Sequence, residues 1–185
     1  MPDVSELPLA GAFVLEPQPV ADERGWFARY FCVQEFESRR PGLNFVQFNH
    51  SYTRARGSIR GMHLQVGDAA EEKLVKCVRG AVLDVLVDVR RGSPTFLRHA
   101  TVRLSEGAGN AVFIPKGVAH GFQTLQDDTE LIYHHSNFYA PEAERGLRYD
   151  DPRLAIEWPL PPADISEKDR AWSWLDADFN GFGVQ

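Results

Sequence analysis

The chain has 185 residues, of which 43% are hydrophobic and 25% are charged, and its formal net charge is −6. Such a length suits one globular domain over residues 1–185, and the negative charge disfavours nucleic-acid binding, although a local basic pocket for a phosphorylated ligand stays possible. The sequence has no apolar run of the roughly 18 residues that a membrane span needs, and its acidic start lacks the layout of a signal peptide. We therefore expect a cytoplasmic protein without membrane contact. Its lone cysteines, Cys32 and Cys77, disfavour both a disulfide framework and a cysteine metal cluster.

Short strands separated by turns dominate the predicted elements. The strand at 82–89 has the clearest pattern, because its valines and leucines alternate with Asp84 and Asp88. Closely spaced strands without helical crossovers indicate an all-β sandwich or jelly-roll barrel, with short helices only at its flanks. In chain order we predict a helix at 33–38, strands at 44–48, 73–78, 82–89, 99–104, 111–114 and 130–138, and a helix that starts at Ser166 and runs through 170–175.

Two segments resemble the paired motifs of a cupin jelly roll. The first is Gly-x5-His, from Gly57 to His63, and the second is Gly-x5-Pro-x-Gly-x2-His, from Gly109 to His120. Metal-binding cupins place a second histidine two residues after the first, whereas this chain has Gln65 there. Two histidines make a poor divalent-metal site, so we expect no metal and no cofactor. Imidazoles free of metal can titrate near neutrality, which suits proton transfer.

Further motifs along residues 10 to 175 resemble the dTDP-4-dehydrorhamnose 3,5-epimerase family. These motifs, in chain order, are Asp-Glu-Arg-Gly-Trp-Phe at 22–27, Gln-Phe-Asn-His-Ser at 47–51, Arg-Gly-Met-His-Leu-Gln at 60–65, Lys-Leu-Val at 73–75, Asp-Val-x-Val-Asp-x-Arg at 84–90, Ser-Pro-Thr at 93–95, Ile-Pro-Lys-Gly-Val-Ala-His-Gly-Phe at 114–122, Tyr-Ala-Pro at 139–141 and Ser-Glu-Lys-Asp at 166–169. The resemblance implies a metal-independent homodimer that acts on a nucleotide-diphospho 4-keto-6-deoxysugar.

The resemblance also implies roles for particular residues. His63 would remove the proton beside the ketone, Asp169 would polarise His63, and Lys73 would stabilise the enolate oxygen. Tyr133 would return a proton from the opposite face. The substrate would be held by Arg24 and Arg60 at the diphosphate, by Gln47 and Asn49 near the nucleotide, and by His120, which we expect in the pocket beside Asp84.

Several structural interpretations compete with these roles. Asp169 lies three residues after Ser166, where an acid simply caps a helix, and Tyr133 is a natural core aromatic of a strand. The family pattern is also altered at Arg29, Phe48 and Lys116, which changes the expected charge near the substrate-gripping segments. Alternative functions are a metal-dependent cupin oxygenase, a 3,4-ketoisomerase and a non-catalytic sugar-nucleotide-binding cupin. The nucleotide base, the sugar, and inversion at C3, C5 or both stay open.

Overall fold

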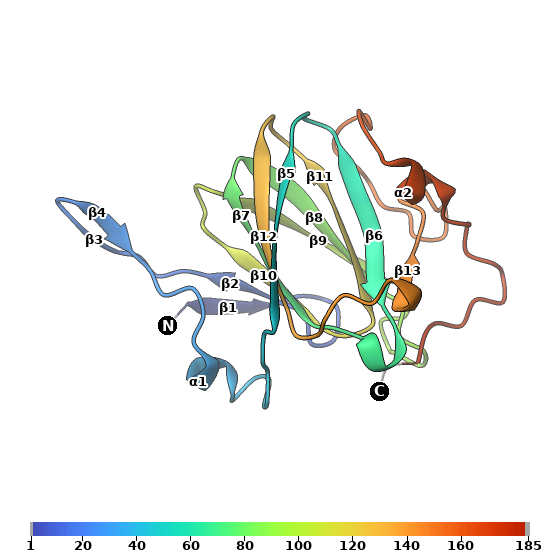
Figure 1. Ribbon diagram of the computed structural model, residues 1–185, viewed down its shortest axis with the longest axis horizontal. Helices are drawn as coiled ribbons and strands as arrows, with labels where there is room; N and C mark the ends of the chain where they lie inside the picture. The colour runs from blue at the N-terminus through green and yellow to red at the C-terminus, as the bar shows by residue number, and fades with distance from the viewer. Residues whose placement is uncertain (1, 184–185) are drawn as a thin grey trace.

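Two antiparallel sheets face each other in the computed structural model, which describes residues 2–183 (Figure 1). The six-stranded sheet has the order β1-β2-β10-β7-β12-β5, and the five-stranded sheet has the order β13-β6-β11-β8-β9. The predicted all-β barrel with short flanking helices is thereby confirmed. The elements are β1 (Asp3–Glu6), β2 (Phe13–Glu16), β3 (Val20–Asp22), β4 (Gly25–Phe27), α1 (Val33–Phe36), β5 (Gln47–Thr53), β6 (Ile59–Gln65), β7 (Lys73–Arg79), β8 (Ala81–Asp88), β9 (His99–Ser105), β10 (Ala111–Ile114), β11 (Val118–Thr124), β12 (Thr129–His135), β13 (Glu144–Gly146) and α2 (Glu167–Ala171), with 3-10 turns at Gly67–Ala69 and Pro141–Ala143.

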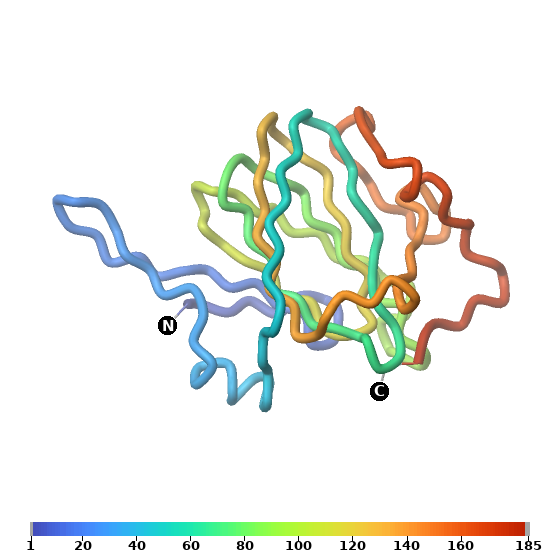
Figure 2. Tube along the Cα trace, viewed as in Figure 1, coloured from blue at the N-terminus to red at the C-terminus, as the bar shows by residue number. Residues whose placement is uncertain are grey.

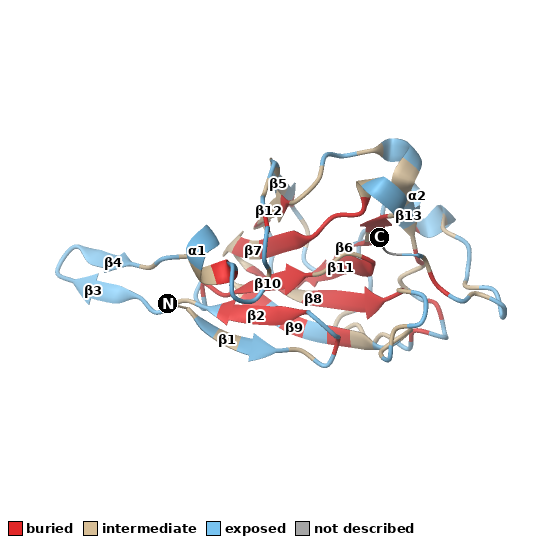
Figure 3. Ribbon diagram, turned by 90° about the horizontal axis from the view of Figure 1, so that it is seen from below, coloured by how far each residue is buried: buried red, intermediate tan, exposed pale blue. Residues whose placement is uncertain are grey.

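The main core lies between the two sheets. Inward side chains of β7 and β12, such as Val75 and Leu131, pack with those of β8 and β11, such as Leu86 and Phe122, and all four are almost fully buried. Figure 3 shows this buried layer running through the central strands. Removing this much apolar surface from water is the main stabilising contribution to the barrel.

The outer face of the five-stranded sheet is covered by the chain that follows β13. Val85 and Val87 on β8 contact a cluster that includes Leu147 and Leu154. Figure 2 shows this C-terminal chain passing along the side of the molecule next to β6. Both faces of β8 are therefore buried, with Val82 and Leu86 in the main core and Val85 and Val87 under the covering segment. This covering segment also brings α2 to β6, where it contributes to the site.

Most predicted elements are present, and four of them have changed boundaries. The strands at 73–78, 82–89, 99–104 and 111–114 agree with β7, β8, β9 and β10 to within one residue at each end. The strand expected at 44–48 instead runs from 47 to 53, because its inner side chains line a polar cavity and carry no apolar period. The strand expected at 130–138 ends at His135, where Ser136 and Asn137 bond the chain into a turn.

The C-terminal helix is shorter than predicted. It ends at Ala171, and Trp172 has extended backbone angles. Gly146 on β13 explains the interruption, because the Trp172 ring lies against it so closely that any Cβ at Gly146 would overlap the indole. The helix at 33–38 likewise shortens to Val33–Phe36.

The hairpin of β3 and β4 projects away from the barrel (Figure 1). Its residues are exposed throughout, including Val20, Trp26 and Phe27 at 66–74%. Exposed large apolar side chains gathered on one hairpin are typical of a surface that contacts a partner. Residues 2–183 contain no helix with the length and apolar character that crossing a membrane requires.

Candidate active site

A cavity of about 490 Å³ lies between the sheets, beside the main core. It is lined by side chains of β5, β6, β7, β11 and β12 and by the segment that leads into α2. Seven of the nine residues predicted for the site belong to its wall: Asn49, Arg60, His63, Lys73, His120, Tyr133 and Asp169.

His63 and Asp169 form a hydrogen-bonded pair in the wall of the cavity. His63 Nε2 lies 2.5 Å from Asp169 Oδ1, and the other carboxylate oxygen accepts from the Gly61 backbone N–H at 3.2 Å. Burial raises the pKa of Asp169, but the hydrogen bond and charge of His63 outweigh it and hold the pKa below its usual value. The carboxylate therefore stays ionised and orients the imidazole, leaving Nδ1 as the second ring nitrogen.

The cap of α2 is the Ser166 side chain and not the Asp169 carboxylate, so the competing interpretation of this acid as a helix cap is wrong. The Asp169 backbone N–H donates to the Ser166 hydroxyl at 3.1 Å, the pattern of a helix N-cap. The side chain and the backbone of one residue therefore make different contacts. The cap fixes the start of α2, and this start holds the carboxylate over His63.

Gly61 and Gly121 allow β6 and β11, the strands that carry His63 and His120, to approach closely. His63 on β6 is the direct partner of His120 on β11, so the two lie on neighbouring strands of one sheet. A Cβ on Gly61 would lie 2.6 Å from the Cα of Gly121, and Gly61 has a φ of +113°. Only glycine fits this contact, which brings both imidazoles to the same cavity.

His120 is paired with Asp84 in the buried wall. Nε2 of His120 lies 2.7 Å from Oδ2 of Asp84, which confirms the expected placement of both residues. Burial raises the pKa of Asp84 and outweighs the opposing effect of His120. The second oxygen, Oδ1, has no hydrogen-bond partner among residues 2–183.

Lys73 is buried at the start of β7. Its Nζ lies 3.1 Å from Oε1 of Glu71, and the other oxygen of that carboxylate lies 2.9 Å from Nδ1 of His135. All three side chains are at most 10% exposed. A lysine is rarely buried without such a partner, so this ion pair explains how the cavity holds an ammonium group.

Tyr133 enters the cavity from β12, in the sheet opposite His63. Its hydroxyl lies 3.0 Å from Ser51 Oγ, and its ring stacks on His135 with centroids 6.1 Å apart. Burial raises the pKa of Tyr133 well above the ordinary value, and the Ser51 contact only partly opposes this. The phenol is therefore neutral at physiological pH and can donate a proton.

The predicted substrate-gripping residues separate into two groups. Arg60 and Asn49 reach the cavity, and Arg60 is held by Thr53 Oγ1 at 3.0 Å. Gln47 lies next to the wall, where it bonds Asn49 and accepts from the Tyr139 backbone N–H. Arg24 is elsewhere: it pairs with Asp22 at the tip of the β3–β4 hairpin with its side chain 89% exposed.

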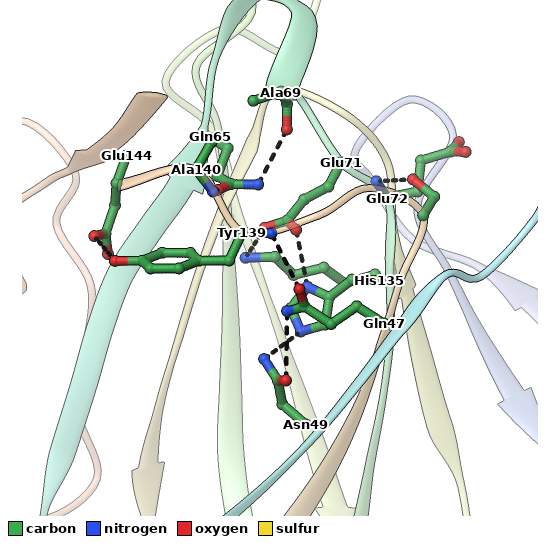
Figure 4. A network of polar contacts seen from close by, with 12 residues as sticks. Gln47, Asn49, Gln65, Ala69, Glu71, Glu72, His135, Tyr139, Ala140 and Glu144 are labelled. Carbon is green, nitrogen blue, oxygen red and sulfur yellow. Dashed lines mark hydrogen bonds and ion pairs between the residues drawn. The ribbon is translucent and has the colours of Figure 1, made fainter. Parts of the chain in front are cut away.

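Gln65 stands where metal-binding cupins have their second histidine, and here its side chain makes hydrogen bonds to the backbone of two loops. Its amide donates to the carbonyl of Ala69 and accepts from the N–H of Ala140 (Figure 4). It also donates to the carbonyl of Phe138, so that it ties two loops together at the cavity rim. Among residues 2–183, no group of three or more His, Cys, Asp or Glu side chains is placed to hold a metal ion.

Several cavity residues were missed from the sequence. Glu144 on β13 accepts from Lys168 Nζ at 2.6 Å and from the Tyr139 hydroxyl at 3.0 Å. Glu71 and His135 also line the cavity, and neither of them was given a role from the sequence. The signal was weak, because Glu71 and His135 are separated by 64 positions and become neighbours only in the folded barrel.

The three departures from the family pattern do not line the cavity. Arg29 pairs with Glu35 at 2.9 Å, Phe48 is 63% exposed with its ring against His134, and Lys116 lies in the turn between β10 and β11. None of the three lies in the cavity wall, and the expected change of charge near the substrate-gripping segments stays a prediction.

Comparison with known proteins agrees with this geometry. A family model described as dTDP-4-dehydrorhamnose 3,5-epimerase matches residues 6–177. A Pseudomonas aeruginosa protein of that name is 42% identical over 178 residues, covering 94% of this chain and 97% of the relative. The Legionella pneumophila epimerase RmlC, solved in complex with dTDP-4-keto-L-rhamnose, has a TM-score of 0.90 at 35% identity and covers 100% of this chain and 99% of its own. A Streptomyces niveus relative named dTDP-4-dehydrorhamnose 3-epimerase is 38% identical over 166 residues, which is 89% of this chain and 79% of the relative.

Proposed function

Since this chain belongs to the dTDP-4-dehydrorhamnose 3,5-epimerase family, we propose that it inverts C3, C5 or both in a thymidine-diphospho 4-keto-6-deoxysugar. The observation that carries the proposal is the meeting of His63–Asp169, Lys73 and Tyr133 in one cavity. The reaction passes through an enolate and belongs to deoxysugar biosynthesis.

His63 is the base in this mechanism. Its Nε2–H is engaged by Asp169, so the neutral ring has its lone pair on Nδ1 for the proton next to the ketone. Once protonated, the imidazolium is stabilised by the Asp169 carboxylate. A positioned base of this kind contributes a factor of roughly 10²–10⁴ in rate.

Lys73 stabilises the enolate oxygen. A C–H group beside a ketone is a far weaker acid than an imidazolium, so the His63 base alone cannot complete the proton transfer. A fixed ammonium in a site of low water content compensates for part of this difference, and one lost donor at such a site costs about 2.7–4 kcal/mol.

Tyr133 returns the proton from the other side. Because His63 and Tyr133 come from opposite sheets, a sugar between them exposes its two faces to different groups. The neutral phenol protonates the enolate carbon on the face away from His63, which inverts the centre. Residues that grip the rest of the substrate are Arg60, His120, Asn49 and Gln47.

We further propose that the active form is a homodimer. Arg24 is remote from its own cavity, and the hairpin that carries it exposes Trp26 and Phe27. Docking of this hairpin on a second copy would cover those rings and bring Arg24 to the partner's diphosphate site. Sedimentation of Phe27→Asp should show a monomer, whereas Arg24→Ala should stay dimeric with a raised KM. Full activity of a monomer would refute this assembly.

Incubation with dTDP-4-keto-6-deoxyglucose in deuterium oxide, followed by NMR, tests the reaction. Deuterium at two ring carbons identifies a 3,5-epimerase, and deuterium at one identifies a single-site enzyme, a choice that the relatives leave open because both kinds occur among them. A product with its carbonyl at C3 would identify a ketoisomerase. Binding without any exchange would contradict the proposal and identify a non-catalytic module.

A further inference from the structure

A chain of hydrogen bonds connects the rim of the cavity to its buried lysine. Gln47 Nε2 contacts Asn49 Oδ1 at 3.4 Å, and Asn49 Nδ2 contacts His135 Nε2 at 3.3 Å. His135 Nδ1 lies 2.9 Å from Glu71 Oε2, and Glu71 Oε1 lies 3.1 Å from Lys73 Nζ. Figure 4 shows Asn49, His135 and Glu71 following one another in this order.

One assignment of hydrogens satisfies every link of this chain. A carboxylate only accepts and an ammonium only donates, so both Lys73 and His135 Nδ1 give a hydrogen to Glu71. The neutral His135 ring then accepts at Nε2 from the Asn49 amide group, whose oxygen accepts from Gln47. Reversing any one link would place two donors or two acceptors against each other.

Burial makes the members of this chain depend on one another. The Glu71 side chain is 7% exposed, and burial alone would raise its pKa. The hydrogen bond from His135 and the charge of Lys73 outweigh burial and lower that pKa, so Glu71 stays ionised. Without His135 the carboxylate would lose a partner that it cannot replace from water.

We propose that Glu71 and His135 are positioning residues that hold the Lys73 ammonium where the enolate oxygen forms, and that Asn49 links them to the strand carrying the nucleotide-binding side chains. This inference rests on the proposed function, because it acts through Lys73. None of these contacts requires Glu71 or His135 to touch the reacting carbons. Their effect should therefore appear in kcat more than in KM.

His135→Phe tests the central link. The phenyl ring can keep the stack on Tyr133, but it makes neither hydrogen bond. We expect kcat for deuterium exchange to fall about tenfold, as for a lost hydrogen bond to a charged group, with KM changed by less than about twofold. His135→Asn offers a donor near the Nδ1 position and should recover most of the loss. A merely structural histidine would show no such recovery.

His134→Phe is the matched control. This neighbouring histidine points to the opposite face of β12, against the rings of Tyr30, Phe45 and Phe48, and does not line the cavity. The exchange rate of the His134→Phe variant should equal that of the unmodified protein. If His134→Phe lowered kcat as much as His135→Phe, disturbance of β12 would explain both and the inference would fail.

Two further variants test the ends of the chain. Glu71→Gln has a single acceptor oxygen and cannot serve both neighbours, so exchange should slow about tenfold or more; a faster variant would mean that the carboxylate opposes Lys73. Asn49→Ala combined with His135→Phe should have the kcat of His135→Phe alone, because both break one chain. Additive losses in kcat would overturn the coupling.

Deuterium exchange by the unmodified protein separates failure of the proposed function from failure of the positioning role. If it exchanges no deuterium into the substrate, the proposed function and this inference fall together. If it exchanges normally and His135→Phe exchanges equally well, only the positioning role is wrong.

Discussion

Replacing Asp169 by asparagine separates the charge of its side chain from its place at the start of α2. The carboxylate accepts from His63 Nε2 at 2.5 Å and from the Gly61 N–H at 3.2 Å, while the backbone N–H is capped by Ser166. Asparagine has nearly the same shape and keeps the backbone cap. It can satisfy Gly61 only by turning its oxygen there, which points its amide hydrogens at His63.

This arrangement of the asparagine amide favours a tautomer of His63 that cannot act as the base. An amide donor opposite Nε2 favours the ring with its hydrogen on Nδ1, the nitrogen that must accept the substrate proton. The variant also loses the negative charge that stabilises the imidazolium. We expect the rate to fall by about 10²–10⁴, which corresponds to about 3–5 kcal/mol in the barrier.

Two measurements on three variants test this reasoning. Exchange of deuterium into recovered substrate gives the rate of enolate formation, and thermal unfolding gives stability. Asp169→Asn should lose rate and keep its Tm, Ser166→Ala should keep most of its rate and lose about 1 kcal/mol of stability as a missing helix cap, and His63→Ala should lose exchange altogether. If Asp169→Asn lowered the Tm and exchanged at the normal rate, the carboxylate would serve only to hold the start of α2 against β6.

Four other perturbations give separate outcomes. Tyr133→Phe should still exchange deuterium into the substrate but form little inverted product, and normal inversion by this variant would mean that Tyr133 is only a packing aromatic. Lys73→Ala should slow exchange and inversion together. Activity should survive exhaustive chelation, because the site offers too few metal ligands, and restoration by added Fe, Mn or Zn after a loss would contradict this. Asp88 is buried with hydrogen bonds from Arg90, Ser93 and Thr95, which outweigh burial and lower its pKa from 3.8 to about 2. Its stabilisation of about 2 kcal/mol is therefore present above pH 4 and lost as the pH falls toward 2, so urea unfolding of Asp88→Asn should show a correspondingly smaller pH dependence over this range.

The local patterns of the sequence determined the fold class and most of the strands. Alternation in 82–89 and turn residues between short apolar runs predict β8 and its neighbours, because side chains on successive strand positions point to opposite faces. The same logic failed for β5, whose inner face is polar because it lines the cavity. The family resemblance, which rests on the motifs along the chain, implied the candidate residues His63, Lys73 and Tyr133.

Only the tertiary structure decided how those residues are held. The pairing of Asp169 with His63 spans 106 positions, and the chain from Asn49 through His135 to Glu71 joins three separate strands and loops. Such contacts have no local period, since they arise where the two sheets and the C-terminal segment meet. The position of Arg24 on a projecting hairpin, outside its own cavity, follows in the same way from packing between distant segments and not from the residues beside it.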